Sequence, residues 1–215
     1  KRMRIVDLQY ANGKVAICEW IFMDYEGVMY VGLELYGCTK TPNEGVKWTP
    51  DQVFAEIHRI ENEHRWLQGK KIQGVADPAI WDAQTGESLA ERAAKYQVYF
   101  QKGDHERLPG WMQMHYRLSF DENGYPMMYF FKNCKGAIRT LPLLMYDEHK
   151  PEDIDTSGED HIADALRYGC MARMIKPRVA PAPDGYSQTP MAMFLDIPKE
   201  DIIAKPKRQR YEVKE

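Results

Sequence analysis

The sequence of 215 residues lacks several features that would assign a chain to a class of protein. Its four cysteines form no CxxC pair and have no histidines at zinc-ligand spacing, so neither a zinc site nor a disulfide framework is predicted. No run approaches the roughly 18 uninterrupted apolar residues of a membrane span, and no signal peptide precedes the first predicted strand. We therefore expect a protein of a reducing, cytoplasmic setting that is neither exported nor membrane-spanning.

A surplus of positive charge is also missing. The formal net charge of -3, with 28% charged residues, argues against a protein that coats nucleic acid or membrane by bulk charge. No GxxxxGK[ST] motif occurs, so ATP-driven translocation is not expected of this chain. The chain begins at Lys1 rather than Met, and we expect it to be a domain excised from a longer protein.

The N-terminal part has the pattern of three antiparallel strands. Residues 2–9 alternate and then run apolar into Asp7, which predicts a strand that ends in an acid. Residues 15–23 and 28–36 are rich in β-branched and aromatic residues, and the turn residues 24–27 between them favour a hairpin. These segments predict a three-strand meander.

Helical and strand-like segments alternate after the meander. Thr49 and Pro50 have the chemistry of a helix start. The predicted helices are 49–66, 86–96, 108–118, 135–144 and 160–174, and the predicted strands are 71–76, 98–100 and 127–131. This order predicts an α/β domain over residues 1–176 with a mixed sheet and helices on its faces. Prolines and a basic KPKRQR patch make residues 177–215 a C-terminal tail.

Acidic residues stand where predicted strands end and where the last predicted helix begins. Asp7 and Asp77 each close a strand, so their carboxylates converge if the two strands are neighbours. Asp160, His161 and Asp164 lie near one face of a helix. Converging carboxylates repel one another unless a cation lies between them, which favours Mg²⁺ or Mn²⁺ over zinc, and a histidine ligand tilts the choice toward Mn²⁺.

Each of these acids also has a purely structural explanation. Asp160 is a good N-cap, and acids in a first helical turn are favoured by the helix dipole. On a helical wheel the acids lie opposite Ile162 and Leu166, as they would on a solvated face. Asp7 and Asp77 are also ordinary turn initiators. The combination of all these acids is what favours a metal centre.

Three stretches resemble the C-terminal nuclease domain of phage large terminase subunits, whose fold is similar to RNase H. They are GVADPAIWD (74–82), GESLAERAAKYQVYFQKGDHERLPGWMQM (86–114) and PEDIDTSGEDHIADALRY (151–168). The last is the most specific, since the family shows a PED, a DT, a DH and a DALRY-like segment in this order. The resemblance covers about residues 4–175. It implies an RNase H-like mixed central sheet, an antiparallel meander plus parallel strands, with helices on both faces.

The resemblance also implies an activity. A domain of this family is a metal-dependent endonuclease of a viral genome-packaging motor, which cuts concatemeric double-stranded DNA at the initiation and termination of packaging. It uses two divalent metal ions, Mg²⁺ or Mn²⁺, which are held by acids and lie about 4 Å apart. The implied partners are double-stranded DNA, an ATPase domain upstream in the full-length chain, the portal and the small terminase subunit. The implied location is the host cell cytoplasm, without a membrane.

The family's site residues map onto the acids described above. Asp7, Asp77 and Asp164 match the catalytic acids, and His161 and Asp160 match assisting metal ligands. Either Asp160 or Asp164 is the direct ligand from the last helix.

Two further mappings concern the first acid and the DNA contacts. Leu8 and Gln9 follow Asp7 where many relatives have an aromatic residue and glycine, so Asp24 is an alternative first acid. The candidates for phosphate contacts are Arg107, which lies in the matched GDHERLPGW segment, together with Lys102, Lys132, Lys135 and Arg139. Solvated surface charge is the alternative explanation for these basic residues.

Two competing functions stay open at this point. One is a DNA-gripping or portal-docking module with little intrinsic cleavage, which the weak basic balance and the residues after Asp7 allow. The other is a different enzyme on the same fold, such as a resolvase or transposase, for which the PED, DH and DALRY segments offer no support.

Overall fold

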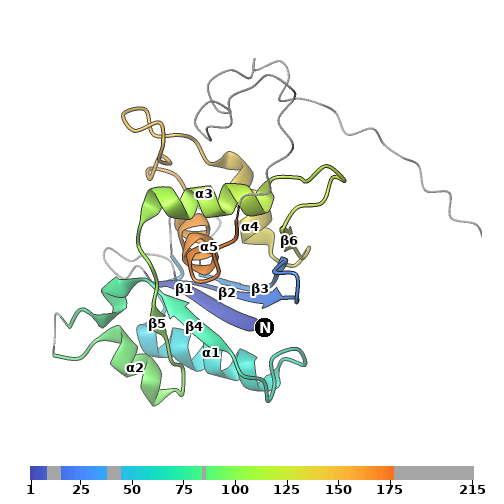
Figure 1. Cartoon of the computed structure of the whole chain (residues 1–215). Helices are drawn as coiled ribbons and strands as arrows, with labels where there is room; N and C mark the ends of the chain where they lie inside the picture. The colour runs from blue at the N-terminus through green and yellow to red at the C-terminus, as the bar shows by residue number, and fades with distance from the viewer. Residues whose placement is uncertain (9–15, 38–44, 84–85, 177–215) are drawn as a thin grey trace, which may run out of the picture. The chain divides into compact units, whose positions relative to one another are not determined.

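The centre of the structure is a six-stranded mixed sheet with the strand order β5-β4-β1-β2-β3-β6 (Figure 1). The computed structural model describes residues 1–8, 16–37, 45–83 and 86–176. The predicted tail, residues 177–215, lies outside the described residues. Within them, no helix has the length and apolar character that crossing a membrane requires.

The predicted meander is confirmed. Its three antiparallel strands are β1 (Arg2–Leu8), β2 (Ala16–Met23) and β3 (Met29–Tyr36). Three shorter strands extend the sheet in parallel: β4 (Gln73–Ala76) on β1, β5 (Gln101–Lys102) on β4, and β6 (Met128–Phe130) on β3. The sheet is therefore the RNase H-like mixed arrangement expected from the sequence.

Helices cover both faces of this sheet, and the alternation of side chains along β1 divides the core in two. Ile5 packs into the cluster that includes α5 residues, whereas Val6 packs into the cluster that includes α1 residues. One face carries α1 (Pro50–Glu63) and α2 (Leu89–Lys95), and the other carries α3 (Arg107–Leu118), α4 (Lys135–Thr140) and α5 (His161–Met171). Two 3₁₀ helices are η1 (Pro78–Trp81) and η2 (Leu141–Leu143).

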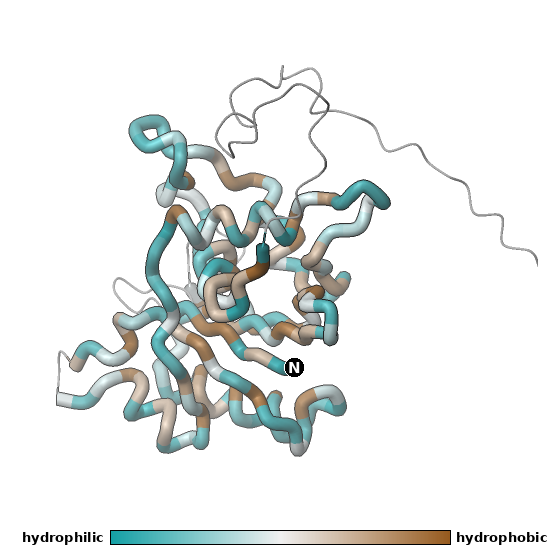
Figure 2. The backbone as a smooth tube through the Cα atoms, in the orientation of Figure 1, coloured by the Kyte–Doolittle hydropathy of each residue, from teal (hydrophilic) through white to brown (hydrophobic). Residues whose placement is uncertain are grey.

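The starts of the two helices on the α1 face follow from their sequences. Thr49 caps α1 by accepting from the Gln52 N–H, and the Gln52 side chain accepts from the Thr49 N–H in return. Ser88 and Glu91 form the same reciprocal box at the start of α2. Hydropathy follows the layers, because apolar segments lie along the central strands and hydrophilic ones along the outer loops (Figure 2).

Two predicted elements were wrong in extent. Residues 98–100 are not a strand, because Val98 donates its N–H to the Ala93 carbonyl and so closes α2, and pairing with β4 begins only at Gln101. The predicted helix 135–144 ends as α4 at Thr140 and continues as η2, since Pro142 cannot donate a helical hydrogen bond.

The helix α5 is enclosed on all sides. Each residue from His161 to Met171 is buried, so the solvated-face explanation of its acids is wrong. Gly169 allows this close approach, because a Cβ there would collide with the side chain of Ile5 in β1 and press on Ile21 in β2. The position of α5 over β1 therefore depends on the missing side chain at residue 169.

Replacing Gly169 tests this packing. We expect Gly169→Ala to lower the free energy of unfolding by at least about 1 kcal/mol, because overpacking outweighs the gain in helix propensity. The matched control is Gly158→Ala, where no atom lies within 4 Å of the added Cβ, and its change should stay within about 0.5 kcal/mol. Urea denaturation followed by circular dichroism measures both, and equal stability of the two variants would contradict the close packing.

Candidate functional site

Asp7 and Asp77 lie at the same end of two neighbouring strands. β1 and β4 run in parallel, and Val6 of β1 pairs with Ala76 of β4. The residue that follows each of these is an aspartate, Asp7 or Asp77. Alternation gives Asp7 the face of Ile5, the face that α5 covers. The strand neighbourhood that the convergence of these acids required is therefore present.

Asp7 meets the first residues of α5. The Nδ1 atom of His161 lies 3.9 Å from Oδ2 of Asp7 and 3.6 Å from Oδ1 of Asp160. The three residues are only 3%, 6% and 5% exposed, in the order Asp7, His161 and Asp160. The fold thus brings an acid of the central strand together with an acid and an imidazole from the start of the last helix.

Asp160 takes the N-cap position of α5 without capping it through its side chain. Its backbone carbonyl accepts from the Asp164 N–H at 2.9 Å, but its carboxylate makes no capping hydrogen bond. The preceding Glu159 turns to other partners, the hydroxyl of Tyr36 at 2.8 Å and the guanidinium of Arg139. Helix capping therefore does not account for the Asp160 carboxylate.

Asp77 serves a local turn and also contacts α5. Its Oδ1 accepts from the Ala79 N–H at 2.6 Å, which starts η1 and matches the turn-initiator explanation. Its Oδ2 accepts from the hydroxyl of Tyr168. Burial, together with the hydrogen bond to Asp77, raises the pKa of Tyr168, so its hydroxyl stays protonated and orients the carboxylate.

The carboxylate of Asp164 lies between two arginine side chains. It accepts from Nε of Arg167 at 3.0 Å and from Nη1 of Arg107 at 3.2 Å. Although Asp160 and Asp164 are four positions apart, their carboxylates lie next to different partners.

Sequence reasoning missed Asp153, which lies in the loop between η2 and α5. It accepts from Nε and Nη2 of Arg107 at 2.9 and 3.0 Å, from Nε1 of Trp111 at 2.7 Å and from its neighbour's N–H at Ile154. Burial opposes ionisation here, but these hydrogen bonds prevail and lower the pKa of Asp153 to about 2. The signal was the PED of the third matched stretch, which contributed to the family resemblance without a role being assigned to its aspartate.

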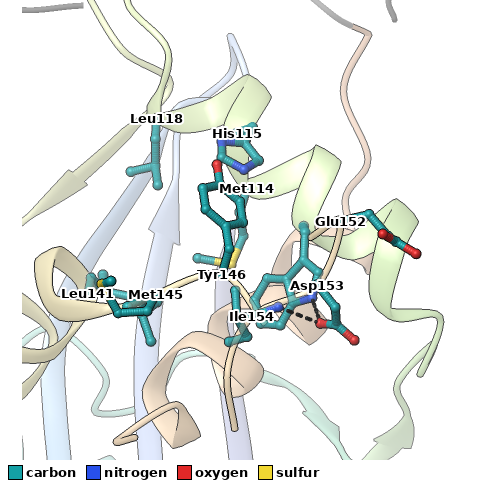
Figure 3. A pocket seen from close by; sticks show the side chains of 11 residues that line it. Met114, His115, Leu118, Leu141, Met145, Tyr146, Glu152, Asp153 and Ile154 are labelled. Carbon is teal, nitrogen blue, oxygen red and sulfur yellow. Dashed lines mark hydrogen bonds between the residues drawn. The ribbon is translucent and has the colours of Figure 1, made fainter. Parts of the chain in front are cut away.

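Asp153 is also one of the residues that line a cavity of about 230 Å³ (Figure 3). Its walls are mostly apolar and come from α3 and from the segment 141–154. Neither Asp7 nor Asp77 lines it. The cavity therefore adjoins Asp153 without containing the acids that meet at the start of α5.

Three of the five basic residues predicted to contact DNA, Arg107, Lys102 and Lys135, come from separate parts of the fold. Lys102 is exposed on the edge strand β5, with its ammonium 5.7 Å from the centre of the Trp81 ring. Lys135 is exposed at the first turn of α4, which packs near β3 toward the opposite edge. Arg107, with a side chain 31% exposed, pairs with Asp153 and Asp164.

Asp24, the alternative first acid, lies at the opposite end of the meander. It follows β2 at the end where Phe22 pairs with Arg2, whereas Asp7 pairs with Ile17. Its Oδ1 accepts from the backbone N–H groups of Glu26 and Val28, as in a tight turn. Asp24 therefore cannot reach Asp77 or the start of α5.

The donor chemistry at the start of α5 fits a divalent ion, although the side chains do not form a closed ligand set. Among the described residues, no group of three or more His, Cys, Asp or Glu side chains is arranged to hold a metal ion. Asp7 and Asp160 provide the carboxylate oxygens that Mg²⁺ and Mn²⁺ prefer, and His161 provides an imidazole nitrogen, a common metal ligand. Asp77 and Asp164 are held by Tyr168 and by arginines.

Comparison with known proteins places this arrangement in a familiar fold. The chain is similar to the solved nuclease domain of the P22 large terminase, with a TM-score of 0.51 and 16% sequence identity over 80% of each chain. No protein-family model matches the sequence, and no curated protein matches it. The similarity confirms the fold that the three stretches implied.

The low pKa of Asp153 predicts how stability depends on pH. Its folded-state pKa, about 2, lies below the ordinary value of 3.8, so its contribution is complete above pH 4 and is lost as pH falls toward 2. Asp153→Asn should lower the free energy of unfolding by about 2 kcal/mol at pH 7. The difference in this free energy between the variant and the unmodified protein should become smaller below about pH 4. Urea denaturation across pH measures this, with the exposed Asp82→Asn as control; a gap that does not change with pH would refute the assignment.

Proposed function

We propose that this chain is the metal-dependent DNA endonuclease domain of a viral genome-packaging motor. The observation that carries the proposal is the meeting of Asp7 with Asp160 and His161 at the edge where Asp77 also ends its strand. The shared fold with the P22 large terminase nuclease domain supports the same conclusion. The substrate is concatemeric double-stranded DNA, cut when packaging begins and when it ends.

The chain's own side chains then divide the work. Asp7 and Asp160 would hold two divalent ions, Mg²⁺ or Mn²⁺, with His161 as a nitrogen donor. When bound, such ions supply a nucleophilic water at neutral pH and stabilise the leaving 3′ oxygen. Asp77 completes the acidic edge, and Tyr168 fixes its carboxylate in position through a hydrogen bond.

Between the two acids of α5, the contacts favour Asp160 as the direct ligand. Its carboxylate lies beside the imidazole that also faces Asp7. Asp164 instead lies between two guanidinium groups, whose permanent charge competes with a metal ion for its oxygens. Asp164 would influence the metal centre without touching the ions, through the electric field of its carboxylate and by orienting Arg107.

The proposal extends to DNA and to the rest of the motor. Arg107, Lys102 and Lys135 would contact phosphates at separate points, as a long duplex allows. An ATPase domain upstream in the full-length chain would supply translocation, and the portal and the small terminase subunit would direct the domain to its cut site. The place of action is the host cell cytoplasm.

One observation favours a second candidate, a DNA-gripping or portal-docking module with little intrinsic cleavage. Asp77 and Asp164 are already engaged by Tyr168, Arg107 and Arg167, and no closed ligand group is formed among the described residues. A module of this kind would bind DNA in Mn²⁺ without cutting it.

Plasmid cleavage separates the two candidates. We expect the chain to convert supercoiled plasmid in Mn²⁺ and to lose this activity in EDTA. Asp7→Asn, Asp77→Asn and Asp160→Asn should each reduce the rate at least about 100-fold, because each removes several kcal/mol of metal-dependent stabilisation of the transition state.

Two further variants sharpen the assignment. Asp164→Asn should reduce the rate only about tenfold, the loss typical of a residue behind the ligands. Asp24→Asn, at the far end of the meander, should cut like the unmodified protein. If the chain binds plasmid in Mn²⁺ without cutting it, the result supports the docking module and contradicts the nuclease. If Asp24→Asn abolishes cleavage, Asp24 and not Asp7 is the first catalytic acid.

Metal binding can also be followed without DNA. A ligand that binds only the folded state stabilises it by about 2.7 kcal/mol at 100 times its dissociation constant. We expect Mn²⁺ to raise the melting temperature of the unmodified chain by several degrees. Differential scanning calorimetry should show a much smaller rise for Asp7→Asn or Asp160→Asn, and an unchanged rise would exclude these residues as ligands.

A further inference from the structure

The guanidinium of Arg107 is shared unequally between two carboxylates from different parts of the chain. Toward Asp153 it offers a two-pronged contact, with Nε 2.9 Å from Oδ2 and Nη2 3.0 Å from Oδ1. Toward Asp164 it offers only Nη1, at 3.2 and 3.4 Å from the two oxygens. The geometry therefore ties Arg107 mainly to Asp153.

Asp153 is itself fixed in place. Its Oδ1 accepts from the indole N–H of Trp111 and from the backbone N–H of Ile154 (Figure 3). Trp111 is 6% exposed and belongs to the core beneath α3. A carboxylate with these donors has little freedom to follow Arg107 if the arginine moves.

The second arginine on Asp164 cannot adjust. Arg167 is 2% exposed and lies against the rings of Trp111 and Tyr168, with its carbon in the guanidinium 5.4 and 4.5 Å from the ring centres. Its side chain also fills the space that a Cβ on Gly110 would need. Arg107 has a side chain that is 31% exposed, so it is the partner of Asp164 with room to turn.

The charge of Arg107 reaches the candidate metal centre. The Nη1 atom of Arg107 contacts the carboxylate of Asp164, a residue whose backbone N–H donates to the carbonyl of Asp160 at 2.9 Å, so Arg107 contacts α5 within one helical turn of Asp160. The two arginines and the carboxylates of Asp153 and Asp164 sum to zero charge, since each side contributes two unit charges. Without the charge of Asp153 the sum is +1, so a turn of Arg107 toward α5 would then bring uncompensated positive charge closer to the oxygens of Asp160.

We propose that Asp153 is a positioning residue that holds Arg107 back from α5 and so keeps the acidic centre open to a divalent cation. The inference rests on the proposed function and assigns a task to a residue that binds neither metal nor DNA. Without the Asp153 carboxylate, Arg107 turns to make its two-pronged contact with Asp164 and repels a cation at the neighbouring Asp160. Asp153 of the PED segment then affects cation binding through the position of Arg107, and not directly through its own negative charge.

Mn²⁺ binding to the full 215-residue chain, without DNA, tests the proposal. The free Mn²⁺ signal in electron paramagnetic resonance gives the dissociation constant. Asp153→Asn should weaken binding about tenfold, the usual size for a residue one layer behind the ligands. Arg107→Gln should not weaken binding, because it removes the competing cation.

The decisive variant carries both substitutions. If Asp153 acts through Arg107, Asp153→Asn changes Mn²⁺ affinity less than about twofold when Arg107→Gln is already present. An equal tenfold loss in both backgrounds would overturn the proposal, since it would show an effect of charge alone. Glu152→Gln removes the neighbouring acid, which is exposed, and is the matched control that should leave affinity nearly unchanged.

The outcomes separate this inference from the proposed function. A chain that binds no Mn²⁺ and cuts no plasmid would overturn both. A chain that binds Mn²⁺ and cuts DNA, but whose Asp153→Asn variant binds Mn²⁺ normally, would overturn the positioning role alone. Thermal unfolding of each variant at pH 7 verifies that it is folded before its affinity is compared.

Discussion

A carboxylate that is wholly or partly removed from water is stable only if hydrogen bonds, a cation or a proton compensate for its lost hydration, and this constraint organises the face of the sheet that α5 covers. Asp153 meets it through Arg107, Trp111 and a backbone N–H, and Asp164 meets it through two arginines. Asp77 accepts from the hydroxyl of Tyr168. Each acid is therefore held by a partner from another element, and these polar contacts join α3, α5 and the end of β4.

Glu19, at the middle of β2, faces the same constraint without such partners. It is 0% exposed, and neither carboxyl oxygen has a hydrogen-bond partner in the part of the chain that the structure describes. Burial and then the neighbouring Glu34 raise the pKa of Glu19. Glu34 instead accepts from the N–H groups of Gly136 and Ala137, where the first turn of α4 favours a negative charge. Glu34 thus has backbone N–H donors, whereas Glu19 beside it has no donor among the described residues.

The difference between local and distant partners explains how much the sequence could predict. The meander, the cap at Thr49 and the placement of Asp7 and Asp77 at strand ends all follow from residues close in sequence, and the structure has these elements. The burial of α5 on every side did not follow, because its acids have the pattern of a solvated face until Arg107 and Arg167 are known to cover them. Arg107 meets Asp153 across 46 positions, and Tyr168 meets Asp77 across 91. No spacing rule encodes such pairs.

The chemistry of the partners also divides the acids into two kinds. Guanidinium groups keep their charge at every physiological pH, so a carboxylate paired with arginine is already neutralised and gains little from a metal ion. An imidazole is neutral over part of that range and can then offer its own lone pair to a metal. Asp153 and Asp164 face the first kind of group, whereas Asp7 and Asp160 face His161. The carboxylates for which a divalent cation brings the larger gain are therefore those at the start of α5, and the arginine-bound acids behind them set the field in which that cation would lie.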